Sequence, residues 1–427
     1  MKALKKILDL YNHSSLILRI IIGIIVGAGL GFLVPQASWL SMPGALFVGA
    51  LFVGALKAIA PVLVAVLVAA TLCQRGTKLD KRFGLVIFFY LFSTYLASFA
   101  AVVASFTFPQ TITLSGEYAG TAVAPPEDFH DIVMTLLSSV IANPIEAIAT
   151  GNYLGVLFWA VIIGLALKRF AGDHTREMML NFSDAITQVV RWIINLAPFG
   201  ILSLVFSSVS ESGMDIFVTY GKLMLLLVCT MLAVALILNP MIVAVALRRN
   251  PYPLVFRCLR ESGLTAFFTR SSAANIPVNL SLCEKLGLDR DIYSVSIPLG
   301  ATVNMDGAAV TITIMSLATA HTFGVEVSFP AAMLLSFLSA LAACGSSGVA
   351  GGSLLLIPMA CSLFGIPDDI SMQVVGVGFI IGVIQDSMET AINSSGDVLF
   401  TATAEYVHWK KQGRPLPDFL EKRREKA

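Results

Sequence analysis

The sequence predicts an all-helical polytopic membrane protein with eight transmembrane helices and two re-entrant helical hairpins. The first indication is composition: 56% of the 427 residues are hydrophobic and 13% are charged, about half the charged share of a typical soluble domain, which is roughly 25%. The second is a series of long apolar runs, and the third is the distribution of basic residues between them. A net charge of +1 gives no reason to expect a nucleic-acid partner.

The apolar runs are separated by charged residues and by proline or glycine. They cover 16–34, 44–72, 83–108, 130–167, 180–208, 217–247, 254–283, 288–322, 328–364 and 371–404. The chain starts like a signal peptide, but its first apolar run continues to Val34 without a small-residue cleavage site. We therefore expect a retained first helix.

Basic residues alternate between the two ends of the first six runs. They occur at Lys2, Lys5, Lys6 and Arg19 near the start of the first run, at Arg75, Lys78, Lys81 and Arg82 after the second, at Lys168, Arg169 and Arg176 after the fourth, and at Arg248 and Arg249 after the sixth. The connections after the first, third and fifth runs contain none. Because cytoplasmic loops are enriched in lysine and arginine, this pattern predicts a cytoplasmic N-terminus.

The seventh and ninth runs break this alternation. Run 254–283 has basic residues at both ends, and run 328–364 has none at either end. A run that enters and leaves on the same side satisfies the rule, so we interpret 254–283 as a hairpin from the cytoplasm and 328–364 as a hairpin from outside. The basic tail after Lys410 then returns to the cytoplasm.

The middle of each predicted hairpin is rich in residues that interrupt helices. The first reads TRSSAANIP over 269–277, and the second reads CGSSGVAGGS over 344–353. Non-helical backbone at membrane depth is tolerated only inside protein or around a cavity. Two interrupted segments from opposite sides therefore indicate a binding site between inverted repeats.

The last run contains the polar stretch QDSMETAINSSGD over 385–397. At about 100° per residue, Asp386, Thr390, Asn393 and Asp397 share one helix face, with Glu389 about 60° to one side. Each carboxylate would cost at least ~2.5 kcal/mol at the bilayer centre. A polar seam that packs against other helices would explain the asparagine and threonine, but three acids favour a binding site.

A second polar island, SIPLGATVNMDGAAV over 296–310, lies in the eighth run. Pro298 and Gly300 weaken the helix before Asn304, and Gly307 follows Asp306. A break there would place free carbonyls beside an amide and a carboxylate, which is an oxygen set that suits a hard cation. The alternative is a kinked helix in which Asp306 pairs with a basic residue.

Other polar residues give weaker signals. Arg270, inside the first hairpin, requires an anionic or carbonyl partner. Tyr90, Ser93 and Thr94 in the third run could supply oxygen ligands, although Ser and Thr in membrane helices usually bond to their own helix. The Ser271–Ser272 and Ser346–Ser347 pairs resemble turn formers.

An enzyme and a channel are the two alternatives to a carrier. An intramembrane serine protease needs a base for its nucleophile, and the five histidines lie in loops or near run ends. A channel could also use polar hairpin tips as a filter, but it has little need for an asymmetric set of acids and amides.

Several motifs resemble those of the dicarboxylate/amino acid:cation symporter family, the glutamate-transporter homologues. They are TRSS in the first hairpin, LGATVNMDG in the broken helix, the glycine-rich second tip and the polar face of the last run. Within this family, FFTRSSAANIPVN and CGSSGVAGGSLLLIP are most similar to bacterial members that couple sodium to serine and threonine. The resemblance covers nearly the whole chain.

The resemblance implies an elevator-type homotrimer. The scaffold would comprise 16–72 and 130–208, and the transport part 83–108 and 217–404, with the second hairpin as the extracellular gate. For the substrate, it implies that Ser272 and the Arg270 backbone, with Asn393, hold the α-carboxylate, that Asp386 takes the α-ammonium, and that Val349 and Thr390 line the pocket.

For sodium, the resemblance implies three groups of ligands. The first is Asp397 with the carbonyls of Gly300, Asn304 and Asn393; the second is Thr302, Met305, Ala343, Cys344 and Ser346; the third is Asp306, Asn304, Tyr90, Ser93 and Thr94. The number of coupled ions stays open.

Glu389 occupies a position where acidic-amino-acid members of the family carry an arginine. A glutamate there would repel a substrate carboxylate in a low dielectric. Two further departures are Gly382, where some relatives have aspartate, and Ala350, where proline is usual. We therefore expect a sodium-coupled importer of L-serine and L-threonine in the bacterial inner membrane, with both termini cytoplasmic. The alternative is a sodium- or proton-coupled carrier of other amino acids or of dicarboxylates.

Overall fold

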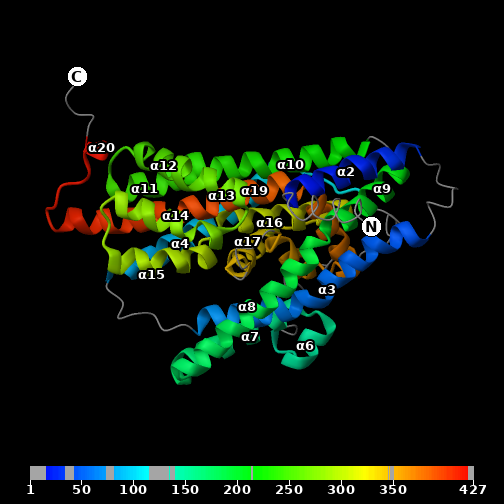
Figure 1. The fold of residues 1–427 in the computed structure, drawn as a ribbon, viewed down its shortest axis with the longest axis horizontal. Coiled ribbons are helices and arrows are strands. Elements are labelled where there is room, and N and C mark those ends of the chain that lie inside the picture. Colours follow the sequence, from blue (N-terminus) through cyan, green and yellow to red (C-terminus); the bar gives the residue numbers. More distant parts are fainter. Residues whose placement is uncertain are drawn as a thin grey trace, which may run out of the picture.

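The computed structural model describes residues 16–33, 43–73, 81–114, 134, 140–212, 215–344, 346 and 351–421, and the described residues form helices and no strands (Figure 1). The longer helices are α2 (Leu16–Leu33), α3 (Pro43–Leu72), α4 (Lys81–Thr107), α7 (Tyr153–Phe170), α8 (Asp173–Asn195), α9 (Ala197–Ser212), α10 (Asp215–Ala233), α16 (Asp306–Thr322) and α19 (Asp368–Lys411). The predicted all-helical class is confirmed for this part of the chain.

Among the described residues, five helices are long and apolar enough to cross a membrane. They cover Phe47–Ala70, Arg82–Thr107, Ile216–Leu247, Arg290–Thr322 and Asp368–Lys411. The pair Asp173–Asn195 and Ala197–Ser207, bent by 49°, becomes a sixth if it is counted as one span. The chain is therefore a multi-pass membrane protein, and the predicted number of eight spans stays a prediction.

Two predicted runs divide differently in the structure. Within 130–167, α6 (Pro144–Thr150) is a separate seven-residue helix that Asn143 caps. It ends at Gly151, whose positive φ of 73° suits a glycine. The run 180–208 begins earlier, at Asp173, and bends between α8 and α9. These helix boundaries come from capping and turn residues that lie inside the apolar runs.

The predicted first hairpin has two helical arms, separated by a break at Arg270 and Ser271. It consists of α12 (Tyr252–Cys258), the π-helical turn η4 (Leu259–Gly263) and α13 (Leu264–Thr269), followed by α14 (Ser272–Lys285). Arg270 takes the left-handed conformation, with φ 52°, and Ser271 caps α14. Hydrogen bonds from Asn275 to Ser262 cross between the two arms.

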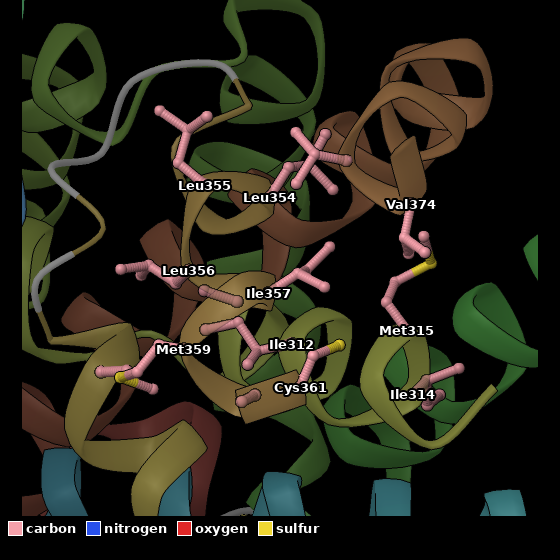
Figure 2. Packing of buried hydrophobic residues seen from close by; sticks show 14 of the residues in the cluster. Ile312, Ile314, Met315, Leu354, Leu355, Leu356, Ile357, Met359, Cys361 and Val374 are labelled. Carbon is pink, nitrogen blue, oxygen red and sulfur yellow. The ribbon is translucent and has the colours of Figure 1, made fainter. Parts of the chain in front are cut away.

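The predicted second hairpin has α17 (Phe329–Ala343) as one arm, and η5 (Ser353–Leu356) with α18 (Ile357–Ser362) as the other. Its return arm is buried against α16 and α19. Figure 2 shows part of this apolar cluster, with Leu354, Ile357, Ile312 and Met315 among the labelled side chains. This packing fixes the return arm beside the polar centre of α19.

The helices pack mainly in two sets. One contains α2, α3 and α6 to α9, in which α2 packs on α9, and α3 packs on α7, α8 and α9. The other contains α4 and the segments from α10 to α19, centred on α16 and α19. In Figure 1, α3, α7 and α8 lie on one side of the molecule, away from α12 and α14.

The eighth predicted run is broken where α15 (Arg290–Val303) meets α16. Asn304 and Met305 lie between the two helices with non-helical backbone angles. Pro298, by contrast, lies inside α15. The predicted break therefore occurs at the NMD sequence itself.

Close contact between α16 and α19 depends on Gly307. A Cβ atom at this position would lie 2.7 Å from the Cα of Glu389. Because that neighbour is backbone, it cannot rotate away. The absence of a side chain at Gly307 thus lets the break approach the polar face of α19.

We predict that Gly307→Ala lowers the midpoint of thermal unfolding in detergent by several degrees, because overpacking of this kind costs about 1–3 kcal/mol. Gly84→Ala is the control, since a Cβ there would meet no atom within 4 Å and alanine suits a helix interior. Equal midpoints for the two variants would contradict the proposed close contact.

Candidate functional site

The candidate site lies where the middle of α19 meets the break between α15 and α16. The turn of the first hairpin and the return arm of the second also reach this region. Backbone carbonyls and polar side chains therefore meet deep inside a largely apolar helical protein.

Asp397 is a buried carboxylate without a basic partner among the described residues. Its side chain is completely inaccessible to solvent. Oδ1 accepts a hydrogen bond from Asn304 Nδ2 at 3.1 Å, and Oδ2 has no partner among the described residues. A buried carboxylate oxygen that accepts nothing is a strong position for a cation.

Asp306 is equally buried and has no basic partner in the described part of the chain. Its Oδ1 accepts from Ser93 Oγ at 2.9 Å and from Thr94 Oγ1 at 3.1 Å. Its Oδ2 accepts from Asn239 Nδ2 at 2.8 Å. The alternative in which Asp306 pairs with lysine or arginine is therefore wrong for the described residues.

Ser93 and Thr94 in the third run each have two acceptors within reach. Each hydroxyl lies within hydrogen-bond distance of the Tyr90 carbonyl in its own helix and of Asp306 Oδ1, and its single proton can go to either. The Tyr90 hydroxyl donates to the backbone carbonyl of Asp397 at 3.0 Å. These three residues thus lie among the polar groups around the two aspartates.

Two asparagines link the helix break to α19. Asn304 Nδ2 donates to the Asn393 carbonyl at 2.9 Å. Asn393 Oδ1 accepts from the Gly307 amide at 2.8 Å, and its Nδ2 contacts Met305 Sδ at 3.3 Å. The predicted combination of a broken helix, amides and carboxylates is therefore present as one connected group.

The buried side chain of Arg270 finds both kinds of partner that the sequence required. Its Nε donates to Asp386 Oδ2 at 2.7 Å, and its Nη2 donates to the Gly382 carbonyl at 3.3 Å. The other Asp386 oxygen accepts from the Gly351 amide at 3.0 Å. Unlike Asp306 and Asp397, Asp386 is neutralised by a protein cation.

Glu389 is held by three donors that act on one oxygen. Its Oε2 accepts from Gln385 Nε2 at 2.6 Å, from Ser353 Oγ at 2.8 Å and from Thr311 Oγ1 at 2.9 Å. Its Oε1 accepts from none of the described residues. The three donors belong to α19, η5 and α16, so the carboxylate joins three elements and keeps one oxygen available.

The remaining predicted residues lie at or near this centre. The hydroxyls of Thr390 and Thr302 donate to carbonyls of their own helices, at Asp386 and Leu299. The carbonyls of Gly300 and Ala343 accept from the amides of Asn304 and Ser346. Cys344 Sγ lies 3.5 Å from the Val303 carbonyl, and Ser272 is buried as the first residue of α14. Val349 lies outside the described residues. The contact at Cys344 places the end of α17 beside the helix break.

Four residues in this network were not assigned a role from sequence: Asn239, Thr311, Ser353 and Gln385. Gln385 begins the polar stretch of the last run, and Asn239 is a single carboxamide in the apolar run 217–247. These signals were available, but their partners are distant in sequence.

A family model for the sodium:dicarboxylate symporter family matches residues 16–406. The serine/threonine transporter SstT of Bifidobacterium adolescentis is 59% identical over 426 residues, covering 100% of this chain and 97% of that protein. The serine/threonine transporter SstT of Streptococcus agalactiae is 56% identical over 402 residues, covering 94% of this chain and 98% of that protein.

We predict that Ser353→Ala lowers the thermal unfolding midpoint in detergent, because a hydrogen bond to a charged group contributes about 1.5–3 kcal/mol. Ser339→Ala is a matched control in α17: Ser339 is fully buried, and its hydroxyl bonds to no described residue. If the two variants unfold at the same temperature, the Ser353–Glu389 contact does not hold the second hairpin to α19.

Proposed function

The chain belongs to the sodium:dicarboxylate symporter family, and from that premise we propose that it couples inward sodium flow to the uptake of L-serine and L-threonine. Both similar transporters carry serine/threonine in their names. The protein would work by alternating access in the bacterial inner membrane, with both termini in the cytoplasm.

The observation that carries this proposal is the pair of buried aspartates without basic partners among the described residues. Asp397 has a bare oxygen beside Asn304, and Asp306 lies beside Ser93 and Thr94. Hard cations prefer carboxylate, carbonyl and hydroxyl oxygens. Sodium bound at each aspartate would remove most of the electrostatic cost of burying it.

We assign one sodium ion to Asp397 with the carbonyls of Gly300, Asn304 and Asn393. A second would lie near Asp306, with Asn304, Tyr90, Ser93 and Thr94. A third candidate group combines Thr302, Met305, Ala343, Cys344 and Ser346. The contact between Cys344 and Val303 supports this last group, because it brings the second hairpin to the break.

For the amino acid, we assign the α-ammonium to Asp386. That carboxylate is bonded to Arg270 and Gly351, so the ammonium must share or replace these donors. The α-carboxylate would be held by Ser272 with the Arg270 backbone and Asn393, and Val349 and Thr390 would line the pocket. Substrate binding would then act on both hairpins, since Arg270 and Gly351 belong to different ones.

Glu389 accounts for the proposed preference for neutral amino acids. Its carboxylate would repel the side-chain carboxylate of aspartate or glutamate at short range in a low dielectric. Its Oε1, which accepts no hydrogen bond from a described residue, could instead accept one from a serine or threonine hydroxyl. Three donors on Oε2 keep the group in place.

We further propose eight spans, two re-entrant hairpins and a homotrimer surrounded by lipid. The helices 16–72 and 130–208 would form the scaffold, and 83–108 with 217–404 would move as the transport part. The preference of α2, α3 and α7 to α9 for one another as packing partners supports this division.

Counterflow in proteoliposomes tests the proposed function. Purified protein should exchange serine and threonine in the presence of sodium, and an inward sodium gradient should drive net serine uptake. Aspartate, glutamate and C4-dicarboxylates should fail to compete. Strong aspartate transport without serine transport would instead favour the alternative carrier of acidic substrates, and unchanged uptake in a sodium-free proton gradient would favour proton coupling.

We predict that Asp386→Ala abolishes serine uptake, because Asp386 is the carboxylate assigned to the α-ammonium and, among the described residues, the only one bonded to Arg270. Asp184→Ala, at an exposed aspartate of α8, is the control and should retain uptake. Size-exclusion chromatography should show the same oligomer for both. Normal uptake by Asp386→Ala would rule out the ammonium assignment.

A further inference from the structure

Asn239 is a carboxamide buried in the sixth apolar run, where nearly every neighbour is hydrophobic. Asn239 Nδ2 donates a hydrogen bond to Asp306 Oδ2 at 2.8 Å. Asp306 is therefore held by Asn239 as well as by the hydroxyls of α4. We propose that Asn239 is a positioning residue for the sodium ion at Asp306. This inference rests on the proposed sodium coupling and extends it to a new element, α11 (Asn239–Leu247).

A π-helical turn brings Asn239 to this position. The turn η3 (Val234–Leu238) lies between α10 and α11. One row of buried residues in this segment has a four-residue spacing, at Met231, Ala235, Asn239 and Val243, with Thr230, Val234 and Ile242 buried beside it. That spacing exceeds the 3.6 residues of a regular helical turn, and the π turn accommodates the extra residue. Such turns are frequent at functional sites.

The two oxygens of Asp306 have chemically different donors. Oδ1 faces the hydroxyls of Ser93 and Thr94, which can rotate and offer lone pairs to a cation. Oδ2 faces the Asn239 amide N–H, which can only donate. When sodium binds at Oδ1, the hydroxyls must turn away while Asn239 keeps its bond. Asn239 would therefore hold the carboxylate in one orientation throughout ion binding and release.

The other side of Asn239 supports a role beyond filling space. Its Oδ1 is buried and has no hydrogen-bond partner in the part of the chain that the structure describes. A cavity of about 10 Å³ lies between Asn239, Cys258 and Ser395, against the first hairpin, where the second π turn, η4, begins. This volume suits about one water molecule, which could donate to Asn239 Oδ1. Among the described residues, the bond to Asp306 is the only protein hydrogen bond that this carboxamide makes.

A purely structural asparagine would give a different result from a positioning residue. If Asn239 only satisfied a buried carboxylate, its loss would reduce folding yield and stability equally with and without sodium. If it positions Asp306 for the ion, its loss should weaken sodium binding specifically, with the serine KM at saturating sodium and the maximal rate little changed.

The test compares Asn239→Leu, which keeps the branched shape at Cγ and removes the donor, with Thr230→Val as a matched control in the same span. Thr230 is also buried, but among the described residues its hydroxyl bonds only within its own helix, to the Leu226 carbonyl. For Asn239→Leu, we expect the sodium concentration for half-maximal serine uptake to rise about tenfold or more, which is the effect of losing a hydrogen bond to a charged group. Thr230→Val should match the wild type.

A second readout does not depend on transport. The rise in unfolding temperature that sodium chloride produces relative to choline chloride should require about tenfold more sodium in Asn239→Leu. If this variant is not recovered from membranes, Asn239→Ala, which needs no extra space, decides the question by the same two measurements.

The outcomes separate the inference from the function on which it rests. Wild-type protein that transports serine without sodium would overturn the proposed function. Sodium-dependent wild-type protein together with an Asn239 variant of unchanged sodium dependence would overturn the inference alone. A stability loss that is equal in sodium and choline would likewise reduce Asn239 to a structural residue.

Discussion

The arrangement of this protein depends on two carboxylates that are buried without a protein cation in the described part of the chain. Asp306 and Asp397 are both inaccessible to solvent, and burying an ion costs several kcal/mol even after relaxation. Amide and hydroxyl donors offset part of that cost at Asp306, but one oxygen of Asp397 accepts no hydrogen bond from a described residue. The site is therefore energetically incomplete without a positive charge, which is the condition that a coupling ion would meet.

The surrounding structure can be understood as the means of bringing these acids together. The break at Asn304 and Met305 frees backbone groups, and Gly307 lets α16 approach α19. Asp386 differs, because Arg270 already neutralises it. The two kinds of acid would thus serve two kinds of cation. Asp306 and Asp397 would take bare sodium, whereas Asp386 would exchange a guanidinium for a substrate ammonium that brings its own carboxylate.

Much of this site could be predicted from sequence because its main signals are local. Helical spacing placed Asp386, Asn393 and Asp397 on one face, and the proline and glycines on either side of Asn304 and Asp306 indicated the broken helix. What sequence could not supply were contacts between distant segments. Asn239 and Asp306 are 67 residues apart, and Thr311 and Glu389 are 78 apart. A polar residue in an apolar helix usually bonds to its own backbone. Only the packing of the helices shows that Asn239 and Thr311 reach a carboxylate on another helix.

Sodium binding by the purified protein tests the central claim most directly. Thermal unfolding in detergent should be followed in increasing sodium chloride, with choline chloride keeping the ionic strength constant and no amino acid present. A ligand that binds only the folded state raises stability with its concentration. The account predicts a saturable rise of the unfolding midpoint in sodium. Identical midpoints in sodium and choline would contradict it, because the buried aspartates would then be stable without a bound cation.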